Sequence, residues 1–227
     1  MTTTLTRLFF ISTGFFIFGS VLAGALDPPG PPAPTMVTLQ QIYDRLATPG
    51  VLAKTGQTGC WDASGNPVSC TGTGEDGAYR LGVSVSPRFT DNANGTVKDN
   101  LTGLIWLKNA NCFGSVDWTS ALSDANTLAS GACGLTDGSV AAAWRLPNIR
   151  EIHSLIDFST YNPALPAGNP FPAVVLGSYY WSSTSQAAAV GFGGGSGAWT
   201  IEFADGITTP LNTLFGAAYV WPVRGGQ

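Results

Sequence analysis

The sequence predicts an α+β domain built from short antiparallel strands and two helices, preceded by a short stalk helix. Glycine and proline, 29 and 15 of the 227 residues, make turns too frequent for a helical bundle and lack the period of collagen. Strand patterns stand on both sides of two helical patterns, an order typical of α+β domains. The share of hydrophobic residues, 44%, is sufficient for a packed core.

The first 25 residues are predicted to be a signal peptide. Arg7 supplies the positive flank, residues 8–22 form an apolar run, and Ala23-Gly24-Ala25 has the small residues typical of a cleavage site. Cleavage would leave no transmembrane segment and would place the protein in the periplasm, on the cell surface or in the medium. The alternative is a retained membrane anchor, which usually needs about 18 or more consecutive apolar residues.

A proline-rich spacer at 26–34 separates this leader from a predicted helix at 35–50. Proline fixes the backbone and removes a hydrogen-bond donor, so we expect the spacer to be extended and semi-rigid. Apolar residues then recur at helical spacing: Leu39, Ile42, Tyr43 and Leu46. A helix this short is unstable alone in water. Its apolar face therefore either docks on its own domain or gathers two or three chains in a coiled coil, and the spacer favours the oligomer.

Four cysteines fit an exported protein with structural disulfides. No spacing is the C-x-x-C of a zinc knuckle or a thiol oxidoreductase, and one histidine cannot complete a Cys/His metal site. Of the three possible pairings we expect Cys60 with Cys70 and Cys112 with Cys133, because each then closes a short loop. A reactive thiol is the alternative. Residues 51–87, rich in glycine, threonine and serine, are predicted to be an irregular segment held by the first disulfide.

Three strands joined by tight turns are predicted at 88–92, 96–100 and 104–107. The turns between them are Ala93-Asn94-Gly95 and Leu101-Thr102-Gly103. Asparagine and glycine are the residues that most readily adopt the positive φ angles of such turns.

Two helices are predicted after these strands. The first begins after Asp117, its expected N-cap, and carries an apolar stripe: Trp118, Ala121, Leu122, Ala125, Leu128 and Ala129. The second begins after Asn148, which forms a capping box with Glu151. Its expected buried face consists of Ile149, Ile152, Leu155 and Ile156.

Strands return at 179–183, 198–203, 207–209 and 218–224, which are predicted to form a closing sheet. Aromatic side chains are concentrated in this part of the chain: Tyr179, Tyr180, Trp181, Trp199, Tyr219 and Trp221. Alternate side chains of a strand point to opposite faces, so some of these rings are expected to face outward, where they can stack on sugar rings. The alternative is that they all belong to the core.

Charge and motifs exclude several function classes. With 10 basic and 14 acidic residues the net charge is -4, and no window concentrates Lys or Arg, which excludes an electrostatic nucleic-acid surface. The lone His153 is not typical of a catalytic triad, and no phosphate loop is present. An EF-hand calcium loop around Gly95 would need an acidic ligand at the position of Thr90.

Glycoside cleavage would need a pair of carboxylates, and the spacing of the acidic residues in the sequence does not indicate such a pair. The candidates are Glu151, Asp157, Glu202 and Asp205. We expect no catalytic residue, cofactor or metal.

Four motifs, in this order, resemble the Lcl C-terminal domain, the module at the end of a collagen-like bacterial adhesin. They are RFTDNANGTVKDNLTGLIWLKNANC, WRLPNIREIHSLID, YYWSSTS and YVWPVRGG. The resemblance implies that residues 88–227 form this domain and that the protein is a surface or secreted homotrimer. It also implies a sulfated polysaccharide as the ligand class.

The RLP tripeptide before a helix and the closing VRGG are similar to the C-type lectin superfold, which includes formylglycine-generating enzymes and the variable proteins of diversity-generating retroelements. This similarity implies a C-type lectin-like fold. The enzyme branch uses cysteines in its C-terminal half, and none follows Cys133 here, so its oxidase chemistry should not transfer. The sugar-binding motifs E-P-N, Q-P-D and W-N-D of calcium-dependent lectins are also absent.

The predicted function is adhesion or extracellular glycan binding by an exported protein without enzymatic activity. The expected ligand-binding residues are Tyr180, Trp181, Trp199, Tyr219, Arg145 and Arg224. The two arginines are equally well explained as partners in buried ion pairs. The alternative function is a structural or protein-binding subunit of a cell-envelope or extracellular assembly, and the third is a hydrolase or a formylglycine-enzyme-like oxidase.

Overall fold

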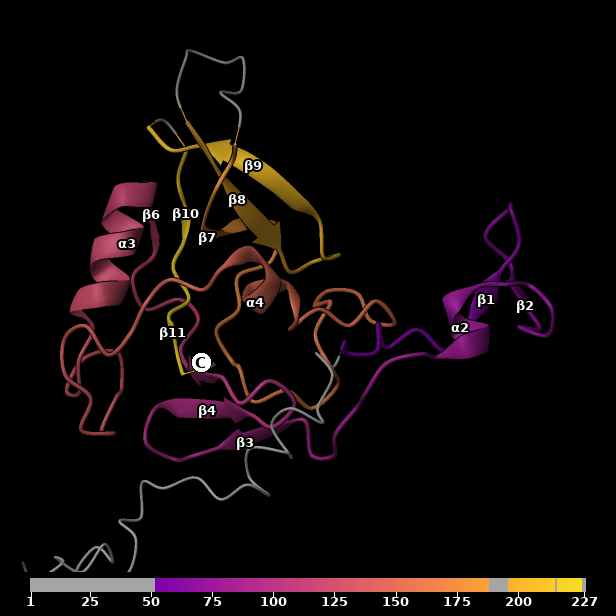
Figure 1. Ribbon diagram of the computed structural model, residues 1–227, viewed down its shortest axis with the longest axis horizontal. Helices are drawn as coiled ribbons and strands as arrows, with labels where there is room; N and C mark the ends of the chain where they lie inside the picture. Colours follow the sequence, from indigo (N-terminus) through magenta and orange to yellow (C-terminus); the bar gives the residue numbers. More distant parts are fainter. Residues whose placement is uncertain (1–51, 188–195, 215, 226–227) are drawn as a thin grey trace, which may run out of the picture. The chain divides into compact units, whose positions relative to one another are not determined.

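The computed structural model describes residues 52–187, 196–214 and 216–225. The predicted signal peptide, spacer and stalk helix lie outside the described residues. The chain divides into two units, 1–49 and 50–227, and every described residue belongs to the second. Its elements in chain order are β1 (Cys60–Trp61), β2 (Pro67–Val68), α2 (Asp76–Tyr79), β3 (Phe89–Asp91), β4 (Thr96–Asp99), β5 (Ile105–Leu107), β6 (Ser115–Val116), α3 (Trp118–Thr127), α4 (Ile149–His153), β7 (Tyr179–Ser185), β8 (Gly197–Glu202), β9 (Thr208–Asn212), β10 (Ala218–Tyr219) and β11 (Val223–Arg224) (Figure 1).

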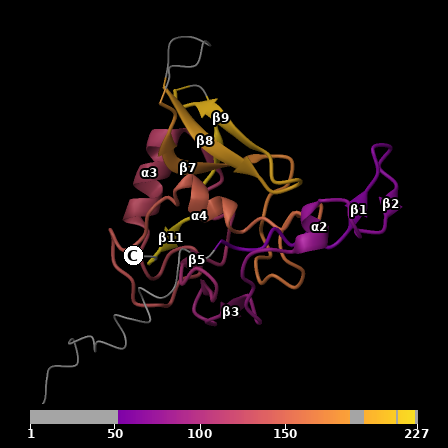
Figure 2. The same cartoon turned by 45° about the vertical axis from the view of Figure 1, so that its right-hand side comes forward.

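The architecture is α+β, as predicted. One sheet has the order β11-β5-β4-β3, a second has the order β6-β10-β7-β8-β9, and β1 and β2 form a separate hairpin. The two views show α3 and α4 beside the second sheet (Figure 1, Figure 2), where α3 packs on β7 and α4 packs on β7 and β8. No helix in the described part of the chain is long and apolar enough to cross a membrane.

The three strands predicted between residues 88 and 107 are confirmed as β3, β4 and β5, paired antiparallel in sequence order. Gly95 in the first turn has φ +83°, and a Cβ atom there would lie 2.4 Å from the carbonyl oxygen of Gly134. Only glycine fits both the left-handed backbone and this close approach.

Both predicted helices are present with their predicted caps. Asp117 accepts a hydrogen bond from the backbone N–H of Ser120 at the start of α3. Asn148 and Glu151 form the reciprocal capping box of α4. The helix α4 ends at His153, earlier than its apolar pattern, although Leu155 and Ile156 beyond it are still buried.

The C-terminal segment does not form the single strand that was predicted at 218–224. It forms two short strands in different sheets: β10 pairs with β6 and β7, and β11 pairs with β5. The chain crosses between the sheets at Trp221, which is completely buried and whose indole N–H donates to the carbonyl oxygen of Leu107. Burial of this large ring between the sheets therefore divides the predicted strand.

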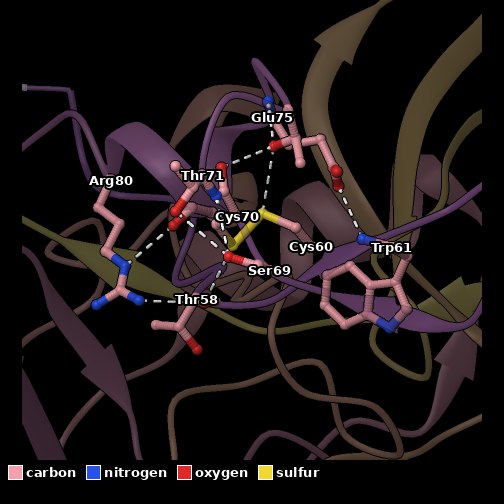
Figure 3. The surroundings of a disulfide bond; sticks show 10 residues. Thr58, Cys60, Trp61, Ser69, Cys70, Thr71, Glu75 and Arg80 are labelled. Carbon is pink, nitrogen blue, oxygen red and sulfur yellow. Dashed lines mark hydrogen bonds between the residues drawn. A yellow bond between two sulfur atoms is a disulfide. The ribbon is translucent and has the colours of Figure 1, made fainter.

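Both predicted disulfides are confirmed, Cys60–Cys70 and Cys112–Cys133. The segment predicted to be irregular contains more regular structure than expected, since the first disulfide lies beside the β1–β2 hairpin and α2. In Figure 3 the side chain of Glu75 accepts from the backbone N–H of Trp61, and Arg80 donates to the carbonyl oxygen of Thr58. Side-chain hydrogen bonds and a disulfide together hold a segment that is too small to have its own core.

A buried ion pair joins the first sheet to α4. Asp99 on β4 is fully buried and receives two hydrogen bonds of 2.8 Å from the guanidinium of Arg88. The same guanidinium donates to the carbonyl oxygen of Ser154, just after α4. Asp99 also accepts from the Thr102 hydroxyl and the Leu101 amide, so the hydrogen-bonding capacity of the buried carboxylate is well satisfied.

We expect Asp99→Asn to lower the free energy of unfolding by about 3–5 kcal/mol, because it leaves the Arg88 charge without its buried partner. The matched control is Asp91→Asn, which makes the same chemical change in the partly exposed Lys108–Asp91 pair and should cost much less. Urea denaturation of both variants measures the difference. Equal losses of unfolding free energy in the two variants would show that the buried Arg88–Asp99 pair stabilises the fold no more than the exposed pair does.

Candidate functional site

Two of the aromatic residues expected to bind ligand are in the core. Tyr180 and Trp181 are each 0% exposed, so neither ring has a face free to stack on a sugar. The Trp181 indole N–H donates to the carbonyl oxygen of Val116, and the Tyr180 hydroxyl accepts from the Val175 amide. Burial raises the pKa of Tyr180 to about 12. The stacking role predicted for these two residues is therefore corrected to a packing role.

Trp199 and Tyr219 are partly buried. The strand register places both on the same face of the second sheet as Tyr180, but β7 separates their strands. The Tyr219 ring packs on Tyr180 with 5.5 Å between centroids. The structure thus does not assemble the predicted aromatic residues into one exposed platform, and ligand binding by Trp199 or Tyr219 stays a prediction.

Arg145 and Arg224 both hold structural ion pairs, the alternative explanation that the sequence offered for them. Arg145 donates two hydrogen bonds, of 2.8 and 2.7 Å, to the carboxylate of Glu151, and these bonds raise the pKa of the arginine. Arg224 lies 3.0 Å from the buried carboxylate of Asp137 and over the ring of Trp144, 5.0 Å from its centroid. Their charges are compensated within the fold.

A cleft beside α4, here called the α4 cleft, is the strongest candidate site. It has a volume of about 410 Å³, within the usual range of ligand pockets. Its apolar lining residues are Leu52, Ala53, Ile149, Ile156 and Phe158. Its polar lining residues are Lys54, Thr55, Arg150, His153 and Ser154.

Local structure explains why the polar residues of α4 face this cleft. The helix directs Ile152 into the core, so Arg150 and His153, three positions apart, share an outward face. The opposite wall is the segment at 52–55, which is fixed by a parallel bridge between Ala53 and Val83. The amide of Phe158 also donates to the carbonyl oxygen of Thr55, at 2.7 Å. One backbone hydrogen bond therefore ties the segment at 52–55 to the chain that follows α4.

Nothing in the described part of the chain neutralises the positive charge of the α4 cleft. Among the described residues, no carboxylate lies within ion-pairing distance of Lys54 or Arg150, and none lines the cleft. The nearby Asp76 is bonded to the Thr55 hydroxyl and is not a lining residue. A lining with two unpaired cations and several apolar residues is suited to a ligand with anionic groups on a partly apolar frame.

His153 can add a third positive charge to the cleft. Burial lowers the pKa of its imidazole, because desolvation disfavours the charged form. The ring contacts Phe158, with centroids 5.8 Å apart. At neutral pH the imidazole is therefore uncharged, and an anion bound beside it would favour its protonation.

Sequence reasoning missed this site because its parts are distant in the chain. The pair Arg150 and His153 was visible as a polar face of a predicted helix, but nothing near Lys54 linked it to that helix. In the described part of the chain, no group of three His, Cys, Asp or Glu side chains is arranged to hold a metal ion.

Comparison with known proteins gave one family. A family model described as the Lcl C-terminal domain matches residues 95–224. Searches of curated proteins and of solved structures found no match. The matched range begins inside the β3–β4 turn and ends with β11, so it contains α3, α4 and every strand of the two larger sheets except β3.

We expect the protein to lose stability as the pH falls below about 6.5, where histidine in an unfolded chain takes up its proton. The folded state binds this proton less readily because the pKa of His153 is lowered. Urea denaturation between about pH 7 and pH 5 measures the effect, and His153→Gln should reduce the decline.

Carboxylates act in a separate pH range. Hydrogen bonds from Ser120 hold the pKa of Asp117 below its ordinary value, so its contribution to stability is lost only under more acidic conditions, below about pH 4. If the His153→Gln variant loses stability as steeply as the original chain between neutral and mildly acidic pH, the assignment of the decline to His153 is wrong.

Proposed function

Because the chain belongs to the Lcl C-terminal domain family, we propose that it is an exported, adhesin-like surface protein that binds an anionic extracellular polysaccharide in the α4 cleft. The observation that carries this proposal is the convergence of Lys54, Arg150 and His153 on one cleft with no carboxylate in its lining. No enzymatic step is part of the proposed function. A sulfated chain is the ligand with the best chemical fit.

Sulfate groups remain ionised at every physiological pH, and they bind through charge and through hydrogen bonds from Lys and Arg. The Phe158 side chain, 48% exposed, supplies an apolar surface for the C–H face of a sugar ring. The net charge of the chain, -4, does not prevent such binding. Screening confines the effect of distant charges to about 8 Å at physiological salt, so the local field of the cleft dominates.

The proposal includes a location outside the cytoplasm, a C-type lectin-like fold and a homotrimeric assembly. Two disulfides support an oxidising compartment. The lectin-like fold is supported by the return of the last strand, β11, to the sheet that begins with β3. The trimer is supported by the predicted stalk helix at 35–50, and three copies of the cleft would raise the avidity for a long chain.

A structural or protein-binding role is the second candidate. Several large apolar residues are more than half exposed: Leu52, Tyr79, Leu81, Tyr161 and Leu214. Exposed apolar surface of this kind is typical of protein interfaces when it is contiguous. This role requires no glycan ligand, so a binding measurement separates the two candidates.

We expect the full chain to bind a sulfated polysaccharide such as heparin, and to bind it more weakly as salt is raised. Lys54→Gln and Arg150→Gln should each weaken binding by about threefold and the double variant by about tenfold, which equals ~1.4 kcal/mol. Isothermal titration calorimetry at low salt measures these changes.

The matched control is Lys98→Gln, which removes the same charge from an exposed side chain of β4 and should change binding by less than about twofold. Equal affinity of the double variant and the original chain would locate the site elsewhere. A correctly folded chain that binds no sulfated polysaccharide would favour the protein-binding role.

A further inference from the structure

We propose that the α4 cleft is the middle of a longer groove, which holds an internal stretch of a linear polyanion rather than a single sugar or a chain end. This inference rests on the proposed function and adds the form of the ligand. It comes from two further depressions that share lining residues with the cleft.

The first neighbouring depression, here called the Ser84 depression, lies where the segment at 52–55 meets the loop before β3. It shares Lys54 and Ile156 with the α4 cleft, and its lining also includes Ser84 and Val85. The two hollows are neighbours because they share these residues, and the proposed groove joins them past Lys54. Lys54 therefore lies at the boundary between them.

The second, here called the Thr102 depression, lies on the other side of α4. It shares Arg150 and Ser154 with the α4 cleft, and it extends to Thr102 and Leu104. Arg150 is thus at this boundary as Lys54 is at the other, and His153 lines the cleft between them. Cationic groups distributed along a path match the regularly spaced anionic groups of a polymer better than they match one compact anion.

Two carboxylates line the outer depressions, and both have partners within the fold. Glu151 in the Thr102 depression is bonded to Arg145 through both of its oxygens. Asp157 in the Ser84 depression accepts hydrogen bonds from the amide and the hydroxyl of Ser159. Arg145 neutralises Glu151, whereas Asp157 keeps its charge and is only oriented by Ser159. Among the described residues, the unpaired cations at the two boundaries of the α4 cleft, Lys54 and Arg150, therefore face one unpaired carboxylate, which lies in the outer Ser84 depression.

One ion pair also connects the walls of the proposed groove. The Arg88 guanidinium joins Asp99 of β4 to the carbonyl oxygen of Ser154, which lines both the α4 cleft and the Thr102 depression. Arg88 itself lines the Ser84 depression. One buried ion pair therefore positions walls of all three hollows, so little ordering is required when a chain binds.

The test uses the full chain and heparin-derived oligosaccharides of graded length. Calorimetry gives the stoichiometry and the affinity of each complex, and the comparison uses one-to-one complexes. We expect this affinity to rise with the length of the oligosaccharide until the groove is filled and then to level off. The gain from the shortest to the longest should be about tenfold or more. Blocking either end of an oligosaccharide that fills the groove should not change its affinity.

Ser84→Tyr places a bulky side chain in the Ser84 depression. Ser84 is exposed, so the fold should tolerate the change. This variant should bind long oligosaccharides only as tightly as shorter ones, and it should bind the shortest one normally. The matched control is Ser123→Tyr, at an exposed position of α3, which should leave every affinity unchanged.

Two results would overturn the extended groove and leave the proposed function intact. They are a short fragment that binds as tightly as long ones, and a Ser84→Tyr variant that keeps the full gain with length. Failure of every fragment to bind the original, correctly folded chain would overturn the proposed function as well. An unsulfated chain of the same length should not bind, and its equal binding would show that charge is not what the groove recognises.

Discussion

The burial of Trp221 between the two larger sheets is the constraint on which the rest of the structure depends. Its indole ring packs against Trp106, Phe171, Tyr180 and Phe203, with centroid separations from 4.8 to 5.7 Å. These rings come from both sheets and from the loop before β7, so one side chain connects the whole core. The short strands on either side of it, β10 and β11, each complete a different sheet. Strands this short are weak alone, and it is the shared aromatic core that stabilises them.

This core also explains why the aromatic residues gave a misleading functional signal. Strand alternation predicts that one face of a sheet is exposed when only the other is covered. Here α3 packs on β7 with Ala121 and Ala125 buried, and the opposite face packs into the Trp221 core, so Tyr180 and Trp181 are buried although they point to opposite faces. The small side chains of α3 permit close approach to the sheet. Coverage of both faces is a property of the tertiary fold, and the strand pattern alone does not contain it.

The features that the sequence predicted correctly are those encoded within a few residues. The caps at Asp117 and Asn148, the turn at Gly95 and two disulfides that close short loops all follow from local chemistry. The division of the last strand at Trp221 and the position of the α4 cleft depend on contacts between distant segments. Arg145 and Arg224 were marked by neighbouring motifs, yet motif residues hold the fold together as often as they bind a ligand, and here both form ion pairs.

The distribution of cations gives an acidic protein a way to bind a polyanion. Four of the described cations, Arg88, Lys108, Arg145 and Arg224, form ion pairs and contribute little outward field. Lys54 and Arg150 have no ion pair in the described residues and line the same cleft. Since exposed acidic groups elsewhere are screened beyond about 10 Å, a polyanion in the proposed groove would experience the charge of the groove and not that of the whole chain. Binding should then be weak for each contact and strong only when a chain engages several contacts together, which is the behaviour required of a surface that attaches to polymers.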